Sequence, residues 1–303
     1  MVQLIHRKEI DTERWNDVIA HSAGETLYAY AWYLDAAAEN WSALIMDDYR
    51  FIMPLIWRKK FGIKYAYHPN FVQQLGVFSK EFIDPVIVKM FLRQLPSKFK
   101  YGNLRFNTSN LIGEEHHFMV ADRLNFELAL NRDYDSVYND FSTNAKRNLK
   151  KALDFHPEII DNITMDDLIS LKKENDISGR EDSYFDWMHK LFSAVKDHGK
   201  IHIIGAKQEG RLVAAALFAF SRKRAIYLLS VSNSEGKDTR AMFGILERFI
   251  KLYAGTDIIL DFEGSNIPSI ARFFNGFGAK PKVYQAVDFA RFPVSMRKLK
   301  GDG

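Results

Sequence analysis

An apolar strand that ends in acidic residues is the feature that most constrains the fold of this chain. Residues 258–265 read IILDFEGS, a hydrophobic run that closes on Asp261 and Glu263. A helical pattern follows over 266–277, with apolar residues three and four positions apart, and Gly278 ends it before another strand. The segment therefore predicts carboxylates at the mouth of a sheet, where a ligand can reach them.

The elements around this segment follow a definite order. The second part of the chain predicts a strand at 125–130, helices at 133–153, 165–174 and 184–195, a three-stranded meander at 201–207, 212–220 and 225–231, a helix at 239–253 and, after the opening segment, a strand at 282–289. The first part repeats this order more faintly, with strands at 3–6, 41–46, 50–58, 64–67, 101–106 and 117–120 and helices at 11–20, 29–38 and 80–93. We expect an α/β (α+β) protein with two domains, 1–123 and 124–303, each a mixed sheet flanked by helices. The final residues are candidates to pack back on the first domain.

Composition excludes several kinds of chemistry. The chain has no cysteine, which rules out disulfides, thiolate nucleophiles and cysteine-bound metals. Its net charge of +4 is compatible with an anionic ligand but does not by itself indicate nucleic acid. The sequence contains no spanning apolar run and no signal peptide, so we expect a cytoplasmic protein. Adjacent His116 and His117 would face opposite ways on a strand, and we expect no metal.

Three stretches resemble one family. They are LNFELALNRDYDSVYNDFSTNAKRNLKKA, the meander at 212–231 with its following helix, and DFEGSNIPSIARFFNGFGA. Together they resemble the Fem-type peptidoglycan aminoacyltransferases and their relatives, which carry two GNAT (acyl-CoA N-acyltransferase-like) domains in tandem. The resemblance covers about the last 180 residues by motif and the first 120 by element order.

The resemblance implies transfer of an acyl or acetyl group from acyl-CoA to an amine acceptor. The alternatives are aminoacyl transfer from tRNA to a peptidoglycan precursor, and a non-catalytic ligand-binding relative of the fold. Two departures from the family bear on this choice. Phe274 stands where the family has a lysine linked to the transfer step, and the glycine-rich pyrophosphate loop is reduced to GKDTRA at 236–241.

Donor binding is expected where two neighbouring parallel strands of a GNAT-like sheet separate. The resemblance implies that backbone N–H groups of Leu229, Ser230 and Val231 contact the acyl-CoA. The loop that follows leads into a helix N-terminus, which attracts anions, and positive charge nearby would favour phosphate. The residues expected to bind the donor there are Lys237, Thr239 and Arg240. The same loop also fits a capped helix, and Asp238 would repel a phosphate.

Catalysis is expected from Asp261 and Glu263, which lie two apart on a strand and so share a face. Either carboxylate could serve as the general base for an amine if burial raises its pKa. The alternative is that both cap the next helix or accept loop N–H groups. Ser265 is expected to cap that helix, since no histidine stands at a spacing that indicates a triad.

Acceptor binding is expected from a basic helical run. Lys146, Arg147, Lys150 and Lys151 place like charges four residues apart, which weakens a helix unless an anionic partner offsets it. A solvated helix face explains the run equally well. Further expected acceptor contacts are Arg180, Asn275 and Tyr284. The acceptor would be a small-molecule or peptide-like amine that carries an anionic group.

Overall fold

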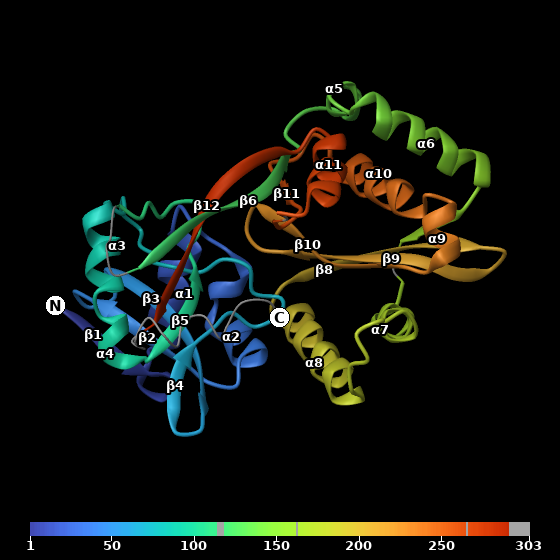
Figure 1. Cartoon of the computed structure of the whole chain (residues 1–303). Helices are drawn as coiled ribbons and strands as arrows, with labels where there is room; N and C mark the ends of the chain where they lie inside the picture. Colours follow the sequence, from blue (N-terminus) through green and yellow to red (C-terminus); the bar gives the residue numbers. More distant parts are fainter. Residues whose placement is uncertain (114–117, 162, 265, 291–303) are drawn as a thin grey trace. The chain divides into compact units, whose positions relative to one another are not determined.

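The chain forms two compact units. The computed structural model describes residues 1–113, 118–161, 163–264 and 266–290. Unit 1 contains residues 1–123 and the chain from Val283 onward, and unit 2 contains residues 124–282 (Figure 1). Ser265, expected as a helix cap, and the pair His116 and His117 lie outside the described residues.

Unit 1 is built on a sheet with the strand order β1-β2-β3-β4-β5-β12. Its strands are β1 (Val2–His6), β2 (Trp41–Met46), β3 (Phe51–Lys60), β4 (Ile63–Ala66), β5 (Tyr101–Arg105) and β12 (Lys280–Ala290, with residues from Val283 in this unit). β4 and β5 run parallel, whereas the other neighbours are antiparallel. The turn between β2 and β3 places Asp47, Asp48 and Tyr49 at positive φ, which makes the chain reverse tightly.

The helices of unit 1 begin where the sequence supplies a cap. They are α1 (Thr12–His21), α2 (Ala31–Ala37), α3 (Pro85–Leu92) and α4 (Leu95–Lys98), with 3-10 turns η1 (Arg7–Glu9) and η2 (Leu27–Ala29). Asp11 caps α1 by accepting the N–H groups of Glu13 and Arg14. The helix predicted at 80–93 was too long at its start, because Asp84 caps α3 and Pro85 occupies its first turn.

Unit 2 has a sheet with the order β6-β11-β10-β9-β8-β7. Its strands are β6 (Met119–Ala129, with residues from Leu124 in this unit), β7 (Glu158–Asp161), β8 (Lys200–Gln208), β9 (Arg211–Phe220), β10 (Arg224–Ser232) and β11 (Ile259–Asp261). β10 and β11 are parallel and the other recorded pairs are antiparallel. β7 was not predicted; it adds an edge strand beside β8.

Helices cover both faces of the unit 2 sheet (Figure 1). They are α5 (Tyr134–Asn139), α6 (Thr143–Phe155), α7 (Met165–Glu174), α8 (Asp182–His198), α9 (Ser234–Asp238), α10 (Ala241–Tyr253) and α11 (Pro268–Gly276). α6, α10 and α11 lie on one face, and α7 and α8 lie on the other. Among the helices of the described residues, none combines the length and the apolar character needed to cross a membrane.

The single helix predicted at 133–153 is wrong, because the chain breaks there into α5 and α6. Phe141 turns into the core between the two helices and is 3% exposed. Ser142 then starts α6 by accepting the N–H of Ala145. A buried aromatic side chain followed by a serine cap therefore ends one helix and begins the next.

The core of unit 2 centres on a pair of stacked rings. Phe218 on β9 and Phe249 on α10 have ring centroids 3.8 Å apart and planes inclined by 17°. Both side chains are fully buried. Their contact fixes α10 against the middle of the sheet, where Phe218 pairs with Tyr227 of β10.

Phe218→Ala is expected to lower the free energy of unfolding by about 3–5 kcal/mol, because it removes a buried ring and leaves a cavity. Chemical denaturation followed by circular dichroism measures the change. The control is Phe155→Ala, since Phe155 is 47% exposed at the end of α6. That control should stay within about 0.5 kcal/mol of the parent chain. Equal losses in the two variants would contradict the assignment of Phe218 to the core.

Candidate functional site

The two parallel strands of unit 2 separate after a short paired segment. β10 pairs with β11 only from Arg224 to Ile226, opposite Ile259 to Asp261. β10 continues to Ser232, whereas β11 ends at Asp261. The later residues of β10 therefore form no backbone pairing with β11. Leu229, Ser230 and Val231, expected to contact the donor, lie on this stretch.

A β-bulge lies at the point of separation. The register of β10 against β9 shifts between Tyr227 and Leu229, so that Leu228 is the extra residue. Tyr227 pairs with Phe218 and Ser230 pairs with Ala216, which are two apart on β9 and share its face. The bulge thus brings Tyr227 and Ser230 to the same face, where the Ser230 side chain lowers the pKa of the Tyr227 phenol.

Tyr227 is a polar residue of the site that the sequence analysis missed. A spacing of three residues places two strand side chains on opposite faces, and only the bulge brings Tyr227 and Ser230 together. Burial raises the pKa of the Tyr227 phenol above its ordinary value, against the lowering effect of Ser230. The hydroxyl therefore stays protonated at neutral pH and can act as a hydrogen-bond donor.

A buried charge network lies at the start of the paired segment. Arg224 Nη1 donates to Glu127 Oε1 at 2.7 Å and to Asp261 Oδ2 at 2.6 Å. The side chains are 20%, 13% and 8% exposed, respectively. Asn125 extends the network, because its Nδ2 lies 3.4 Å from Glu127 Oε1 and its amide also contacts the Asp261 carboxyl. One guanidinium thus holds carboxylates from β6 and β11 against β10.

The network occupies the sheet face opposite α6, α10 and α11. Leu260 and Leu128 pack into the core beneath those helices, and Asp261 and Glu127 are their neighbours along the strands. Successive side chains alternate between faces, so the two carboxylates point the other way. The hydroxyls of Tyr227 and Ser230 and this charge network therefore lie on opposite faces of one sheet.

Both oxygens of Asp261 are engaged. Oδ2 accepts from Arg224, and Oδ1 accepts the backbone N–H of Glu263 at 2.9 Å. Burial raises the pKa of the Asp261 carboxyl, against the lowering effect of Arg224, and Glu127 adds to the rise. This geometry suits a residue that positions its neighbours better than one that takes a proton from a ligand.

Glu263 lies directly beyond the end of β11 with an unusual backbone. Its φ is 59°, in the left-handed region that side-chain-bearing residues rarely adopt. Two contacts hold it there: its N–H donates to Asp261, and its carbonyl accepts the N–H of Phe126 at 3.2 Å. Its side chain is half-buried. The strained backbone places this carboxylate at the mouth of the strand, where the sequence predicted it.

The loop expected to bind phosphate is itself partly helical. The helix predicted from Thr239 starts later, at Ala241, and α9 forms before it. Thr239 is buried, and its hydroxyl donates to the carbonyl of Glu235 at 2.9 Å, which holds the start of the connection against the end of α9. Lys237 and Arg240 are exposed, with Arg240 Nη1 bonded to the carbonyl of Lys237 at 2.9 Å. The structure therefore gives Thr239 a role inside the connection and leaves the two cations at its surface.

The residues expected to bind the acceptor fall into three places. Lys146, Arg147 and Lys150 lie along α6, next to Asn275, because Gly276 accepts the N–H of Ser142 at the start of that helix. Arg180 is bonded to Asp176 at 2.9 Å in the connection between α7 and α8, on the other face of the sheet. Tyr284 is buried on β12 in unit 1.

The position of the family's lysine is filled by an aromatic core residue. Phe274 on α11 stacks on Phe262 with centroids 4.9 Å apart, and it also lies 5.9 Å from Phe126 and 6.3 Å from Tyr227. Phe274 is 6% exposed. The ring is thus part of the apolar core beneath the separating strands. This position therefore carries no charged side chain.

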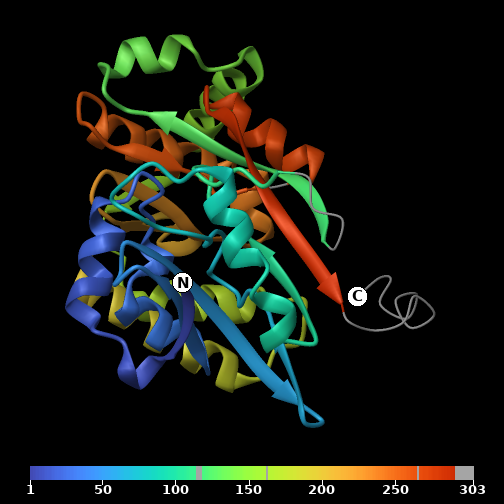
Figure 2. The same ribbon diagram turned by 90° about the vertical axis from the view of Figure 1, so that its left-hand side faces the viewer.

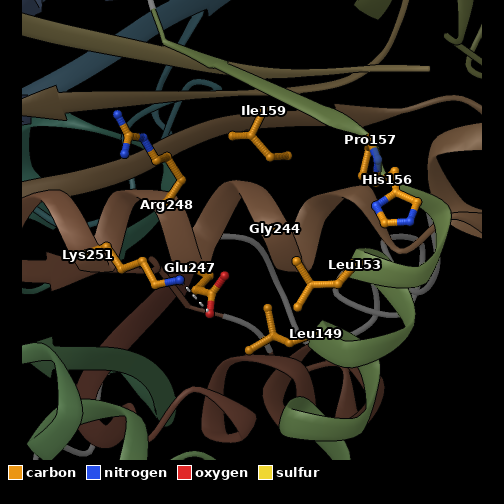
Figure 3. Close-up of a pocket in the computed structure, with 10 residues that line it drawn as sticks. Leu149, Leu153, His156, Pro157, Ile159, Gly244, Glu247, Arg248 and Lys251 are labelled. Carbon is orange, nitrogen blue, oxygen red and sulfur yellow. Dashed lines mark ion pairs between the residues drawn. The ribbon is translucent and has the colours of Figure 1, made fainter. Parts of the chain in front are cut away.

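A surface cavity of about 450 Å³ lies elsewhere in unit 2, between α6, β7 and α10 (Figure 3). Leu149, Leu153 and Ile159 supply apolar walls. Three charged side chains that line it are already paired: Lys251 with Glu247 at 3.1 Å, and Arg248 with Asp161 at 2.6 Å. No lining residue comes from β10 or β11, so this cavity is distinct from the strand separation.

Within the described ranges, no group of three or more His, Cys, Asp or Glu side chains is arranged to hold a metal ion. The acidic residues at the strand mouth are held by Arg224 and by backbone N–H groups instead.

Comparison with solved structures identifies the fold. No protein-family model matches the chain, and no curated protein matches it. The structure is similar to that of FemX, with a TM-score of 0.64 and 11% identity over 98% of this chain and 99% of that one. It is also similar to a tandem GNAT protein from the clavulanic acid biosynthesis pathway, with a TM-score of 0.58 and 13% identity over 97% of this chain and 99% of that one. L-PGS from Bacillus licheniformis is similar as well, with a TM-score of 0.54 and 11% identity over 95% of this chain and 94% of that one. The expected Fem/GNAT-like α/β fold is thereby confirmed.

Arg224→Met is expected to lower the free energy of unfolding by about 3–5 kcal/mol at neutral pH, because two buried carboxylates lose their cation. Because burial raises the pKa of Asp261, the stability linked to its proton is present below the ordinary aspartate pKa and is lost as pH rises through the folded value. Without Arg224 that folded pKa rises further. The deficit should therefore shrink as pH falls from neutral to weakly acidic, measured by urea unfolding.

The matched control is Arg248→Met, which removes a more exposed ion pair with Asp161. That change should cost about 1 kcal/mol or less. His202 also pairs with Asp161, and burial and Arg248 both lower the pKa of His202, so the two variants are compared at neutral pH. If both variants lose the same stability there, the buried network has no special role.

Proposed function

We propose that unit 2 transfers an acyl group from an acyl-CoA, such as acetyl-CoA, to an amine. The observation that carries this proposal is the separation of β10 and β11 beside a β-bulge, in a Fem/GNAT-like fold. Unpaired backbone N–H groups at such a point can bind the thioester arm and its developing oxyanion. The residues proposed for this contact are Leu229, Ser230 and Val231.

The chemistry needs few protein groups. The amine nitrogen attacks the thioester carbonyl carbon, a C–N bond forms, the C–S bond breaks, and CoA leaves as a thiolate. The proton lost by the amine goes to a carboxylate, and a proton from that carboxyl or from solvent neutralises the thiolate. Orientation of donor and acceptor supplies much of the rate. The hydroxyls of Tyr227 and Ser230 are proposed as hydrogen-bond donors near the thioester.

Glu263 is the proposed general base, with Asp261 as its positioning residue. Asp261 has both oxygens engaged and fixes the backbone of Glu263. Glu263 itself is half-buried at the strand mouth and has the backbone geometry that aims it there. This division of roles changes the expectation that either carboxylate could serve.

The donor is proposed to be a CoA thioester in preference to an aminoacyl-tRNA. Phe274 occupies the place of the lysine that the Fem-type enzymes link to transfer, and it is packed among aromatic rings. Lys237 and Arg240 at the α9–α10 connection are proposed to meet the CoA phosphates, and Thr239 to shape the connection. A CoA ester as donor fits a cytoplasmic location.

The acceptor is proposed to be an amine that carries an anionic group. Lys146, Arg147 and Lys150 gather positive charge along α6, and Asn275 lies beside the start of this helix. Arg180 lies on the other face of the sheet and Tyr284 is buried in unit 1, so the proposed acceptor site does not include these two residues. A peptide-like or small-molecule amine with a carboxylate or phosphate meets this description.

Glu263→Gln is expected to lower kcat by about a hundredfold or more, because it removes the proton acceptor. CoA release from acetyl-CoA and longer acyl-CoAs, with a panel of amines, measures the rate. A thiol reagent suits this assay because the chain has no cysteine to react. The control is Asp257→Asn, since the Asp257 side chain is 81% exposed. Wild-type turnover by Glu263→Gln would remove the base assignment.

Lys237→Gln is expected to weaken acyl-CoA binding by about two- to fivefold, the effect typical of one exposed charge contact. Isothermal titration measures the affinity and its dependence on salt. Lys190→Gln, on α8, is the matched control and should leave affinity unchanged. Binding of acyl-CoA without transfer to any amine would favour a non-catalytic relative of the fold. Failure to bind any CoA ester would overturn the enzyme proposal.

A further inference from the structure

The β3–β4 hairpin of unit 1 has an unfavourable residue in its turn. Lys60 pairs with Ile63, so Phe61 and Gly62 form a two-residue turn with φ values of 50° and 77°. Such a turn needs positive φ at both positions and favours Asn, Asp or Gly at the first. A phenylalanine there is locally unfavourable. The ring is nonetheless 90% exposed, so burial in the fold does not explain it.

The strands next to this turn contain a second unfavourable feature, a cross-strand pair of like charges. Lys59 and Lys64 lie directly opposite each other across the two strands, where like charges are destabilising. Arg58 and Lys60 lie on either side of Lys59 in β3, and the sequence from 57 to 67 holds no acidic residue. The nearest recorded counter-charge is Glu39, 3.4 Å from Arg58. We call Arg58, Lys59, Lys60, Phe61 and Lys64 the basic hairpin.

The geometry points to an anionic membrane surface as the partner of the basic hairpin, and we propose that its tip inserts there. The turn extends beyond the other elements of unit 1 in both views (Figures 1 and 2). The aromatic ring lies at the apex and the cations lie just behind it. This order matches the layers of a bilayer surface, where acyl chains lie beneath lipid phosphates.

The layering favours a lipid surface over a single-stranded nucleic acid. Proteins that stack bases do so on aromatic rings along a groove that tracks the backbone. Here the two strand positions nearest the turn, Lys60 and Ile63, offer no ring, and the exposed ring lies at the turn itself. Tyr65 is already stacked on Tyr101 at 4.9 Å. Two unfavourable local features, at Phe61 and at the Lys59–Lys64 pair, are both offset if an anionic interface receives them.

The test is flotation of the full chain with two kinds of vesicle: phosphatidylcholine alone, and an equimolar mixture with phosphatidylglycerol. The wild-type protein is expected to float only with the anionic vesicles and to be released by salt. Phe61→Asn should weaken binding by roughly five- to tenfold. Lys59→Gln and Lys64→Gln should each weaken it by about fivefold.

Phe61→Asn also separates binding from folding. Asparagine suits the turn, so the variant is expected to unfold at the same temperature as the parent chain or at a higher one. The control is Phe82→Asn, since Phe82 is 84% exposed but outside the hairpin, and its binding should be unchanged. Equal binding to neutral vesicles, or wild-type binding by Phe61→Asn, would overturn the proposal. Binding to single-stranded RNA without binding to vesicles would overturn it in favour of a nucleic-acid partner.

Discussion

The geometry of the candidate site depends on the ion pairs that Arg224 forms with two buried carboxylates. Arg224 holds Glu127 of β6 and Asp261 of β11 against β10, and Asp261 in turn fixes the backbone of Glu263. The parallel pairing extends only from Arg224 to Ile226. β11 is short, and the ion network adds side-chain contacts to its backbone pairing with β10 and with β6. The paired part of β10 and β11 therefore begins at a residue that two ion pairs hold in place.

The two faces of the unit 2 sheet carry different kinds of side chain at the site. The face beneath α10 and α11 carries stacked aromatic rings and the hydroxyls of Tyr227 and Ser230. The other face carries the buried charges. An acyl arm needs an apolar, ordered environment with a few donors, whereas proton transfer needs a carboxylate held in place. The proposed function requires that one ligand reaches groups from both faces at the strand separation.

The order of strands and helices could be predicted from sequence because it rests on hydrophobic periodicity. The meander and α7 were placed closely, since apolar spacing and caps such as Thr164 mark their limits. The break at Phe141 was missed, because a buried aromatic residue also fits a continuous helix. The pairing of Tyr227 with Ser230 depends on a bulge, and Arg224 finds its partners 37 and 97 residues away. Such contacts depend on register across strands, which local pattern does not contain.

Left-handed backbone at Glu263 and at Phe61 marks two places where the chain departs from what folding alone would favour. At Glu263 the cost is offset inside unit 2, by hydrogen bonds from its N–H to Asp261 and from Phe126 to its carbonyl. At Phe61 the exposed turn supplies a glycine neighbour and cations, and the ring itself is left in solvent. The proposed base at Glu263 rests on this support within unit 2. The proposed membrane contact at Phe61 rests instead on an exposed ring that an external surface could bury.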